Sequence, residues 1–192
     1  IYHGILAAII LAVGFHHVKN YFSGGIVQFD ESIVEGKRLK TLDSQGVIFK
    51  EGRLGLKLRT QKGVEFINDT KATNVDSVWY ALDAMTKPIV WVLGGQDKGN
   101  DYSSLINLVQ EKVKAIVCLG ADNRKIREVF GEMIPVFEET DTAAKAVNAA
   151  FKLAKEGDVV LLSPACTSFD LFDNYAQRGV FFKDAVLNLH RP

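Results

Sequence analysis

Phe66-Ile-Asn-Asp-Thr-Lys-Ala-Thr-Asn74 is the stretch that decides the fold of this chain, because it joins an apolar run to an amphipathic one. The apolar run at residues 64–67 predicts a strand, and residues 75–85 have the spacing of a helix. The short polar residues between them therefore form a strand-to-helix corner. In open α/β sheets, ligands bind at such corners, beyond the carboxyl ends of the strands.

The corner carries groups that suit an anion. Asn68 and Asp69 leave the strand, Lys71 stands in the turn, and Thr73 or Asn74 can cap the helix. The free amides of a helix N-terminus and a lysine ammonium both favour negative charge. A purely structural interpretation, with two caps and a solvated lysine, explains the same residues.

Beyond the corner, apolar runs alternate with helical patterns. The predicted strands are 64–67, 89–93, 115–119, 135–137 and 159–162, and the predicted helices are 75–85, 102–113, 126–133, 140–154 and 172–189. Strands without polar alternation, each followed by a helix, indicate a mainly parallel sheet covered on both faces. The predicted fold class is α/β and Rossmann-like. Thr140 or Asp141 is the expected cap of the fourth helix, and Asp170 and Asp173 are expected in the first turn of the last.

Three polar loops follow strands of this sheet and are predicted to leave its same edge. They are the corner, Gly94-Gly-Gln-Asp-Lys-Gly99 and Ser163-Pro-Ala-Cys-Thr-Ser168. Lys98 supplies a cation and Ser168 a hydroxyl, so the loops predict a pocket for a dicarboxylate or a phosphate. The second loop is neither a Walker A motif nor a GxGxxG fingerprint. Cys166 has no histidine near it in the loops, so we expect a small buried cysteine.

The bulk composition limits the partners. The chain has 192 residues with 23 basic and 23 acidic side chains, so no overall field favours nucleic acid or membrane lipid. Two cysteines far apart in sequence fit a reducing compartment. We expect a cytoplasmic monomer without membrane insertion. The aromatic residues near the C-terminus are expected in the core; they are Phe169, Phe172, Tyr175, Phe181 and Phe182.

Residues 1–62 are predicted to be an N-terminal appendage to a domain at 63–192. An apolar run at 5–15 is too short to cross a bilayer and predicts a buried helix. Glycine-rich spacing at 21–63 predicts short antiparallel strands. Arg53 and Arg59 are expected to be solvated charges. Because residue 1 is Ile, we expect the numbering to begin inside a longer protein or after a processed end.

The three loops, with Leu162-Ser-Pro-Ala-Cys-Thr-Ser-Phe-Asp170, Phe172, Asn174-Tyr175 and Gln177-Arg-Gly179, resemble a known family. They look like the C-terminal domain of the Mur ligase family, in the branch that adds D-glutamate. The resemblance runs from about residue 63 to 189, with the motifs in order. The Asp-Thr-Lys-Ala-Thr-Asn corner distinguishes this branch from the other Mur ligases and from folylpolyglutamate synthase.

The resemblance implies an ATP-dependent ligase of peptidoglycan synthesis. In that reaction ATP, with Mg²⁺, phosphorylates the carboxylate of UDP-N-acetylmuramoyl-L-alanine, and the amine of D-glutamate attacks the acyl phosphate. Thr73 and Lys98 would hold the α-carboxylate of D-glutamate, and Ser168 and the backbone near Tyr175 its side-chain carboxylate. These groups position and stabilise charge rather than transfer protons.

Two further roles are implied by the same resemblance. Lys71 would face the transferred phosphoryl group as the catalytic residue, and Asn68 and Asp69 would lie toward the nucleotide ribose. No metal ligands are evident in the sequence, and no P-loop motif occurs, so the chain alone is expected not to turn over ATP. The family's His-Arg pair has no counterpart at Glu51-Gly52-Arg53, which leaves Arg53 a weak nucleotide candidate.

Two alternatives remain open. The chain would also fit a stand-alone Rossmann-like module that binds an anion or a partner, or a Mur-type ligase with a different amino-acid choice.

Overall fold

The computed structural model of the chain describes residues 38–41, 44–52, 55–60 and 62–189. The helix expected at 5–15, the apolar run at 26–29 and Arg53 lie outside the described residues. The remaining predictions of strands and helices can be compared with the structure.

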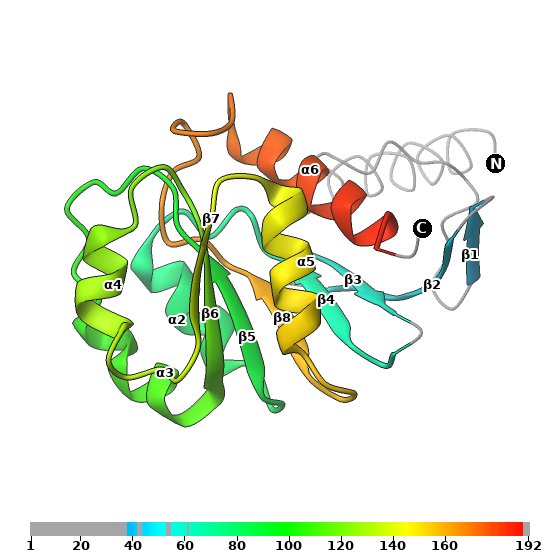
Figure 1. Cartoon of the computed structure of the whole chain (residues 1–192), viewed down its shortest axis with the longest axis horizontal. Helices are drawn as coiled ribbons and strands as arrows, with labels where there is room; N and C mark the ends of the chain where they lie inside the picture. Colours follow the sequence, from blue (N-terminus) through cyan, green and yellow to red (C-terminus); the bar gives the residue numbers. More distant parts are fainter. Residues whose placement is uncertain (1–37, 42–43, 53–54, 61, 190–192) are drawn as a thin grey trace, which may run out of the picture.

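The described strands form one sheet in the order β1-β2-β3-β4-β8-β5-β6-β7 (Figure 1). Their bounds are β1 Arg38–Thr41, β2 Ser44–Gly52, β3 Gly55–Arg59, β4 Glu65–Asn68, β5 Ile89–Leu93, β6 Val113–Leu119, β7 Phe137–Thr140 and β8 Val159–Leu162. Strands β4, β8, β5, β6 and β7 pair in parallel. Strands β1 to β3 add antiparallel pairs to the β4 edge. The predicted α/β, mainly parallel sheet is confirmed.

Helices cover both faces of the parallel strands, with α5 and α6 on the near face in Figure 1. The bounds are α2 Val75–Asp83, α3 Ile106–Lys112, α4 Arg124–Phe130, α5 Ala143–Leu153 and α6 Tyr175–Leu187, with a short 3₁₀ turn at Ser103–Leu105. Helices α2, α3 and α4 pack on the opposite face. The chain thus has three layers over its parallel part.

The alternation of side chains along each strand builds two cores. In β5, Ile89, Trp91 and Leu93 join the cluster under α2 to α4. Val90 and Val92 join the cluster under α5 and α6. All five are completely buried. A strand that is covered on both faces has no position for a polar residue, which is why its sequence reads as one continuous apolar run.

The sheet runs across the division expected between residues 62 and 63, because β3 pairs with β4. The short antiparallel strands predicted before residue 63 are present at 38–41, 44–52 and 55–59. The division into an appendage at 1–62 and a domain at 63–192 stays a prediction. Within the described residues, no helix has the length and apolarity needed to cross a bilayer.

Several predicted bounds were wrong by a few residues. Strand β7 was expected at 135–137 and lies at Phe137–Thr140, where it forms a partly exposed sheet edge. The helix expected at 102–113 starts as a 3₁₀ turn and stops at Lys112, because Val113 already pairs in β6. Helix α4 was expected at 126–133 and occupies Arg124–Phe130. Short elements are fixed by non-local pairing, which periodicity does not report.

The caps also needed correction. Thr142, not Thr140 or Asp141, caps α5 by accepting the amide of Lys145. Thr140 ends β7 instead, and its hydroxyl donates to the carbonyl of Cys118 at 2.6 Å. Asn74 caps α2 as one of the two predicted candidates, accepting the amide of Ser77 at 2.8 Å.

The last helix starts three residues later than predicted. It begins at Tyr175 after the cap Asn174, so Asp170 and Asp173 precede it rather than occupy its first turn. Asp170 Oδ2 instead accepts the amide of Ala121 at 2.9 Å, which ties this segment to the loop after β6. Asp173 is exposed, and its carboxylate accepts a hydrogen bond from Gln177.

The predictions about the C-terminal aromatic group and about Arg59 were only partly right. Phe169, Tyr175 and Phe181 are 64%, 43% and 51% exposed, so only part of the aromatic group is core. Phe182, in contrast, is buried at 1%. The Arg59 side chain is 39% exposed, as expected of a solvated charge, but its guanidinium also pairs with the Glu65 carboxylate at 2.5 Å.

Candidate functional site

The candidate site lies at the carboxyl edge of the central strands. Strand β8 lies between β4 and β5 and is parallel to both. Leu162 at its end is in register with Asn68 of β4 and with Val92 of β5. The loops at 68–74, 94–99 and 163–168 therefore start side by side at one edge of the sheet. The prediction that they share an edge is confirmed.

Hydrogen bonds join the first loop to the third. The amide of Asp69 donates to the carbonyl of Leu162 at 2.8 Å, and the amide of Ala165 donates to the carbonyl of Ala72 at 2.9 Å. The Ser163 hydroxyl donates to Asp69 Oδ2 at 3.1 Å. Contacts at the start and in the middle of each loop hold the two segments in a fixed relative position.

The second loop is joined to the third by a small antiparallel bridge. Gln96 and Thr167 form this bridge, with the Gln96 amide donating to the Thr167 carbonyl at 2.9 Å. The amide of Gly94 also donates to the carbonyl of Pro164 at 2.9 Å. A Cβ atom on Gly95 would lie 2.2 Å from the Thr167 carbonyl oxygen, and its φ is 129°. Only glycine fits where two backbones approach this closely.

Three predicted substrate-binding residues lie within two positions, along the chain, of residues whose backbones join the loops by hydrogen bonds. Thr73 follows Ala72 in the chain, Ser168 follows Thr167, and Lys98 comes two residues after Gln96. Thr73 is half-buried, Ser168 is buried at 2% exposure, and Lys98 is exposed. Within the described residues, the Lys98 ammonium makes no hydrogen bond or ion pair. The structure brings their loops together; the role of each side chain stays a prediction.

The other predicted residues lie in the same part of the molecule. Lys71 is exposed in the first loop, and its carbonyl accepts the amide of Thr73 at 2.8 Å. Tyr175 begins α6 and is 43% exposed. Asn68 donates from Nδ2 to the carbonyl of Gly179 in α6 at 2.9 Å. Its Oδ1 is buried without a hydrogen-bond partner in the described structure. Asn68 therefore fastens α6 to the site.

The carboxyl of Asp69 is the most strongly perturbed acid at this edge. Its burial raises its pKa to about 7, although the hydrogen bond from the Ser163 hydroxyl acts in the opposite direction. Among the described residues no cation pairs with it. A carboxyl that titrates near neutrality beside a polar loop is a common property of functional sites.

Asp97 shapes the loop that carries Lys98. Its Oδ1 accepts the amides of Gly99 and Asn100 at 2.6 and 3.0 Å, and its Oδ2 accepts the Tyr102 hydroxyl at 2.8 Å. Although burial acts in the opposite direction, the hydrogen bond from Tyr102 and those from the loop amides lower the pKa of the Asp97 carboxyl. The loop thus turns around an ionised carboxylate and presents Lys98 at its tip.

Cys166 has a structural role in the same hydrogen-bond network. Its thiol lies 3.3 Å from the Tyr102 hydroxyl and is 1% exposed. Burial raises the pKa of the Cys166 thiol. A buried neutral thiol is a poor nucleophile, which agrees with the prediction of a small buried cysteine.

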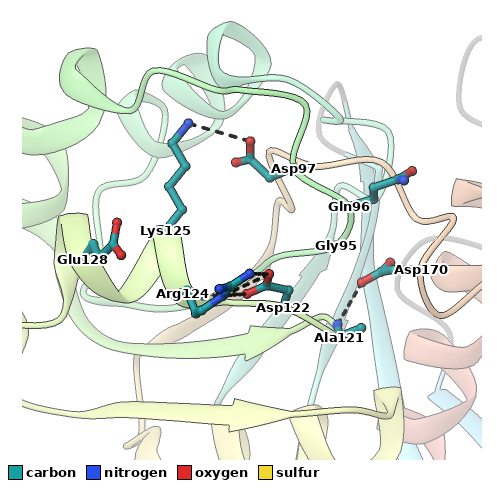
Figure 2. Close-up of a pocket in the computed structure, with 9 residues that line it drawn as sticks. All are labelled: Gly95, Gln96, Asp97, Ala121, Asp122, Arg124, Lys125, Glu128 and Asp170. Carbon is teal, nitrogen blue, oxygen red and sulfur yellow. Dashed lines mark hydrogen bonds and ion pairs between the residues drawn. The ribbon is translucent and has the colours of Figure 1, made fainter.

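A cavity of about 470 Å³ opens beside the second loop. Figure 2 shows its lining, in which Arg124 pairs with Asp122 and Lys125 reaches toward Asp97. The lining residues are Gly95, Gln96, Asp97, Ala121, Asp122, Arg124, Lys125, Glu128 and Asp170. The predicted substrate residues are not among them. Of the three loops, only the second lines the cavity, and it does so without its predicted ligand Lys98.

A metal site is not built from the described side chains. No group of three or more His, Cys, Asp and Glu residues within them is arranged to hold a metal ion. This observation concerns 38–41, 44–52, 55–60 and 62–189 only.

One residue of the site was missed by the sequence reasoning. Arg178 appeared only as a letter of the Gln177-Arg-Gly179 motif, yet it is 1% exposed and hydrogen-bonded to the loops. A signal was available, because Arg178 shares one face of α6 with the buried Phe182 and Val186, four and eight residues further on. An arginine on the buried face of a helix needs partners inside the protein.

Comparison with known proteins agrees with this geometry. Residues 52–166 match the family model described as Mur ligase, glutamate ligase domain. A relative from Christiangramia forsetii, named UDP-N-acetylmuramoylalanine--D-glutamate ligase, is 48% identical over 177 residues, which cover 92% of this chain and 39% of the relative. A relative of the same name from Cytophaga hutchinsonii is 54% identical over 127 residues, 66% of this chain and 28% of the relative.

Among solved structures, E. coli FolC in complex with ADP is similar with a TM-score of 0.48 and 22% identity. The similarity covers 71% of this chain and 32% of that one. The chain spans about two fifths of the length of the Christiangramia forsetii relative, 39%.

The family model matches 115 residues, from 52 to 166, which is more than half of the 192 in the chain. The matched region contains strands β4, β5 and β8 and nearly all of the three loops that meet at their ends. The chain therefore belongs to the Mur ligase family, in which it matches the glutamate ligase domain.

Proposed function

We propose that this chain is the amino-acid-binding part of an ATP-dependent ligase that adds D-glutamate to UDP-N-acetylmuramoyl-L-alanine in peptidoglycan synthesis. The observation that carries the proposal is the meeting of three loops through backbone hydrogen bonds. At this meeting point the Lys98 ammonium has no partner among the described residues, and the hydroxyl residues Thr73 and Ser168 lie next to hydrogen-bonded positions. The names of the two relatives support the same reaction.

The proposed substrate has two carboxylates, and the loops offer groups for both. Thr73 and Lys98 would hold the α-carboxylate of D-glutamate. Ser168 and the backbone near Tyr175 would hold the side-chain carboxylate. The backbone that carries Lys98 is already ordered by Asp97, so binding of a carboxylate by the ammonium costs the loop little conformational freedom.

The reaction proposed for the protein needs ATP and Mg²⁺ as well. ATP supplies the phosphoryl group that converts the carboxylate of UDP-N-acetylmuramoyl-L-alanine into an acyl phosphate. In this chain, Lys71 would stabilise the charge on the transferred phosphoryl group, and Asn68 and Asp69 would lie toward the ribose. These residues position and stabilise charge, which is the main requirement of phosphoryl transfer.

The proposed location is the cytoplasm, where the nucleotide substrates of such a ligase are made and used. A monomer is the proposed oligomeric state. Size-exclusion chromatography with light scattering measures that state directly.

The proposal is tested in the full-length natural protein that contains this chain. The protein is incubated with ATP, Mg²⁺ and UDP-N-acetylmuramoyl-L-alanine, and D-glutamate, L-glutamate or D-aspartate is added separately. We expect phosphate release that depends on D-glutamate and a product whose mass is that of the two substrates less one water. Phosphate release without dependence on D-glutamate, or a faster reaction with another amino acid, would overturn the proposal.

The second candidate is a stand-alone module that binds an anion or a partner. The cavity beside the second loop is the observation that favours it, since that cavity is separate from the predicted ligands of D-glutamate. Calorimetric titration of the chain with D-glutamate and with ATP separates the two candidates. Tight binding of an unrelated metabolite, with no binding of D-glutamate by the full-length protein, would favour the module.

A further inference from the structure

Arg178 is a buried cation that no carboxylate of the described residues contacts in an ion pair. It lies in the first turns of α6 and is 1% exposed, which places it among the largest fully buried side chains of the described structure. Within the described residues it forms no ion pair. Burial lowers the pKa of its guanidinium to about 10, so the group remains protonated at neutral pH. A buried charge in this state must be stabilised by other polar groups.

Those groups come from all three loops. Nε and Nη2 of Arg178 donate to the hydroxyl and the carbonyl of Thr70, at 3.1 and 3.0 Å, in the first loop. Nη1 donates to the carbonyl of Gly94 at 3.4 Å in the second loop and to that of Cys166 at 3.2 Å in the third. One planar group thus touches each of the segments that carry a predicted ligand.

The helix that carries Arg178 is itself fixed to the first loop. The Thr70 hydroxyl donates to the carbonyl of Tyr175 at 2.8 Å, and Asn68 Nδ2 donates to the carbonyl of Gly179. A Cβ atom on Gly179 would lie 2.7 Å from Thr70 Cγ2, so the helix backbone lies directly against the loop. Arg178 therefore extends from a fixed base toward the second and third loops.

The guanidinium of Arg178 also lies close to Gly95, where the second loop packs against the third. A Cβ atom on Gly95 would lie 3.3 Å from Arg178 Nη1 as well as 2.2 Å from the Thr167 carbonyl. The backbone of the second loop can approach the third only because residue 95 has no side chain. The guanidinium lies against this junction and hydrogen-bonds to the carbonyl on either side of it.

A lysine does not replace such a group. Its ammonium is a single point with three donors, whereas the guanidinium offers five donors in a plane and reaches acceptors in several directions at once. The removal of a buried charge from water is unfavourable, and carbonyl dipoles only partly compensate for it. We therefore expect Arg178 to contribute more to the defined relative position of the loops than to the overall stability of the fold.

We infer that Arg178 is a positioning residue, which locks the three loops in the relative placement that brings Thr73, Lys98 and Ser168 to a single dianionic amino acid. This inference rests on the proposed function for the identity of the ligand. The locking of the loops does not depend on that identity, so the two are tested separately. Arg178 contacts no reacting atom and is not a catalytic residue.

Hydrogen exchange measured by mass spectrometry tests the locking in the full-length natural protein. The variants are Arg178→Lys and Arg178→Gln, and the control is Arg127→Lys, which changes an exposed arginine paired with Glu139. We expect the amides of Ala72, Gln96 and Ala165 to lose protection together in both Arg178 variants. The expected loss is about tenfold or more, which corresponds to about 1.4 kcal/mol. The amides of strand β5 should keep their protection, and the control should change none of them.

Loss of protection in one loop only, or unchanged protection in all three, would overturn the inference. If the Arg178 variants do not fold, a pair of variants at Thr70 replaces them. Thr70→Val removes the oxygen that accepts from Arg178 Nε and keeps the shape of the side chain, whereas Thr70→Ser keeps the oxygen. Thr70→Val should expose the loop amides more than Thr70→Ser does, and equal exchange in the two would contradict the inference.

Kinetics connect the locking to the ligand. In Arg178→Lys we expect the KM for D-glutamate to rise by about tenfold or more, with the KM for ATP changed by less than about threefold. If the native protein does not use D-glutamate, the proposed function is wrong, but the hydrogen-exchange result on the locking of the loops still stands. If the native protein uses D-glutamate and Arg178→Lys leaves the KM for D-glutamate unchanged, only the positioning role of Arg178 is contradicted.

Discussion

The carboxyl groups at the two ends of strand β4 have pKa values shifted in opposite directions. Glu65, at the amino end, accepts hydrogen bonds from Arg59 and Lys87 at 2.5 and 2.8 Å. Although burial acts in the opposite direction, these two cations lower the pKa of the Glu65 carboxyl. Asp69, just past the carboxyl end, has the Ser163 hydroxyl as its partner, and burial raises its pKa to about 7.

The same difference holds along the two edges of the sheet. At the amino edge, Lys114 pairs with Asp158, and Lys112 donates to the carbonyls of Leu82 and Asp83. At the carboxyl edge, Lys98 is exposed and has no partner among the described residues. The charges of the amino edge serve the fold, whereas the Lys98 ammonium at the carboxyl edge remains available for a ligand.

The largest expected effect comes from the unpaired cation. In the full-length natural protein, Lys98→Ala should raise the KM for D-glutamate on the order of 100-fold, because a carboxylate would lose a charged partner. The KM for ATP should change far less. Steady-state kinetics with each substrate varied in turn measure both values. Equal losses for the two substrates would contradict the role of Lys98.

Lys112→Ala is the matched control for that variant. It removes a lysine from the amino edge, where the ammonium already donates to two backbone carbonyls. We expect an unchanged KM for D-glutamate together with a small loss of stability. A large rise in this KM would show that the two edges do not differ in function.

A pH experiment on Asp69 should give the next largest effect. Between about pH 4 and pH 7 the folded state keeps a proton on Asp69 that the unfolded chain has lost. The contribution of Asp69 to the free energy of unfolding therefore falls as the pH rises through this window. It is bounded by about 4 kcal/mol, since a tenfold change in protonation equilibrium corresponds to about 1.4 kcal/mol.

The variant Asp69→Asn removes that titration and keeps an oxygen that can accept from Ser163. We expect it to be more stable than the native protein at pH 8 and to lose this advantage toward pH 4. Hydrogen exchange of the amides in β4 and β8, corrected for intrinsic rates, measures the difference. A constant difference between the two proteins from pH 4 to pH 8 would show that Asp69 does not titrate in this range.

Glu65→Gln should give a smaller effect with the opposite dependence on pH. Because the pKa of Glu65 is lowered in the folded state, its stabilisation is present above the unfolded pKa and is lost as the pH falls through the folded value. At pH 7 we expect a loss of about 1–2 kcal/mol, reduced by the exposure of the two cations. Urea unfolding at pH 7 and below pH 4 tests this. If the gap between the variants is as large in acid, the ion pairs are not its cause.

The smallest expected effect concerns the cap at the site. Asn74→Ala removes the oxygen that accepts the Ser77 amide and should destabilise α2 by about 1 kcal/mol. Asn74→Asp retains this acceptor and serves as the control. Hydrogen exchange of the first amides of α2 distinguishes the two variants. Equal protection in both would mean that the cap contributes nothing measurable.

Much of the fold was predictable because its signals are local. The strands at 89–93 and 159–162 were predicted with their observed bounds, since each is a continuous apolar run between polar turns. The common edge of the three loops followed from the rule that parallel strands end on the same side. Thr142 as the cap of α5 and the position of β7 were missed, because pairing with β6 decides where that strand ends.

The sequence by itself determined that the chain forms a mainly parallel sheet with helices on both faces. It also determined which loops carry the polar residues of the candidate site. Only the tertiary structure decided which charges are already satisfied. Glu65 meets Arg59 and Lys87, 6 and 22 residues away, and Arg178 reaches Thr70 across 108 positions. Periodicity reports the environment of a side chain within its own element, whereas a hydrogen-bond partner far along the chain is fixed only when the elements pack together.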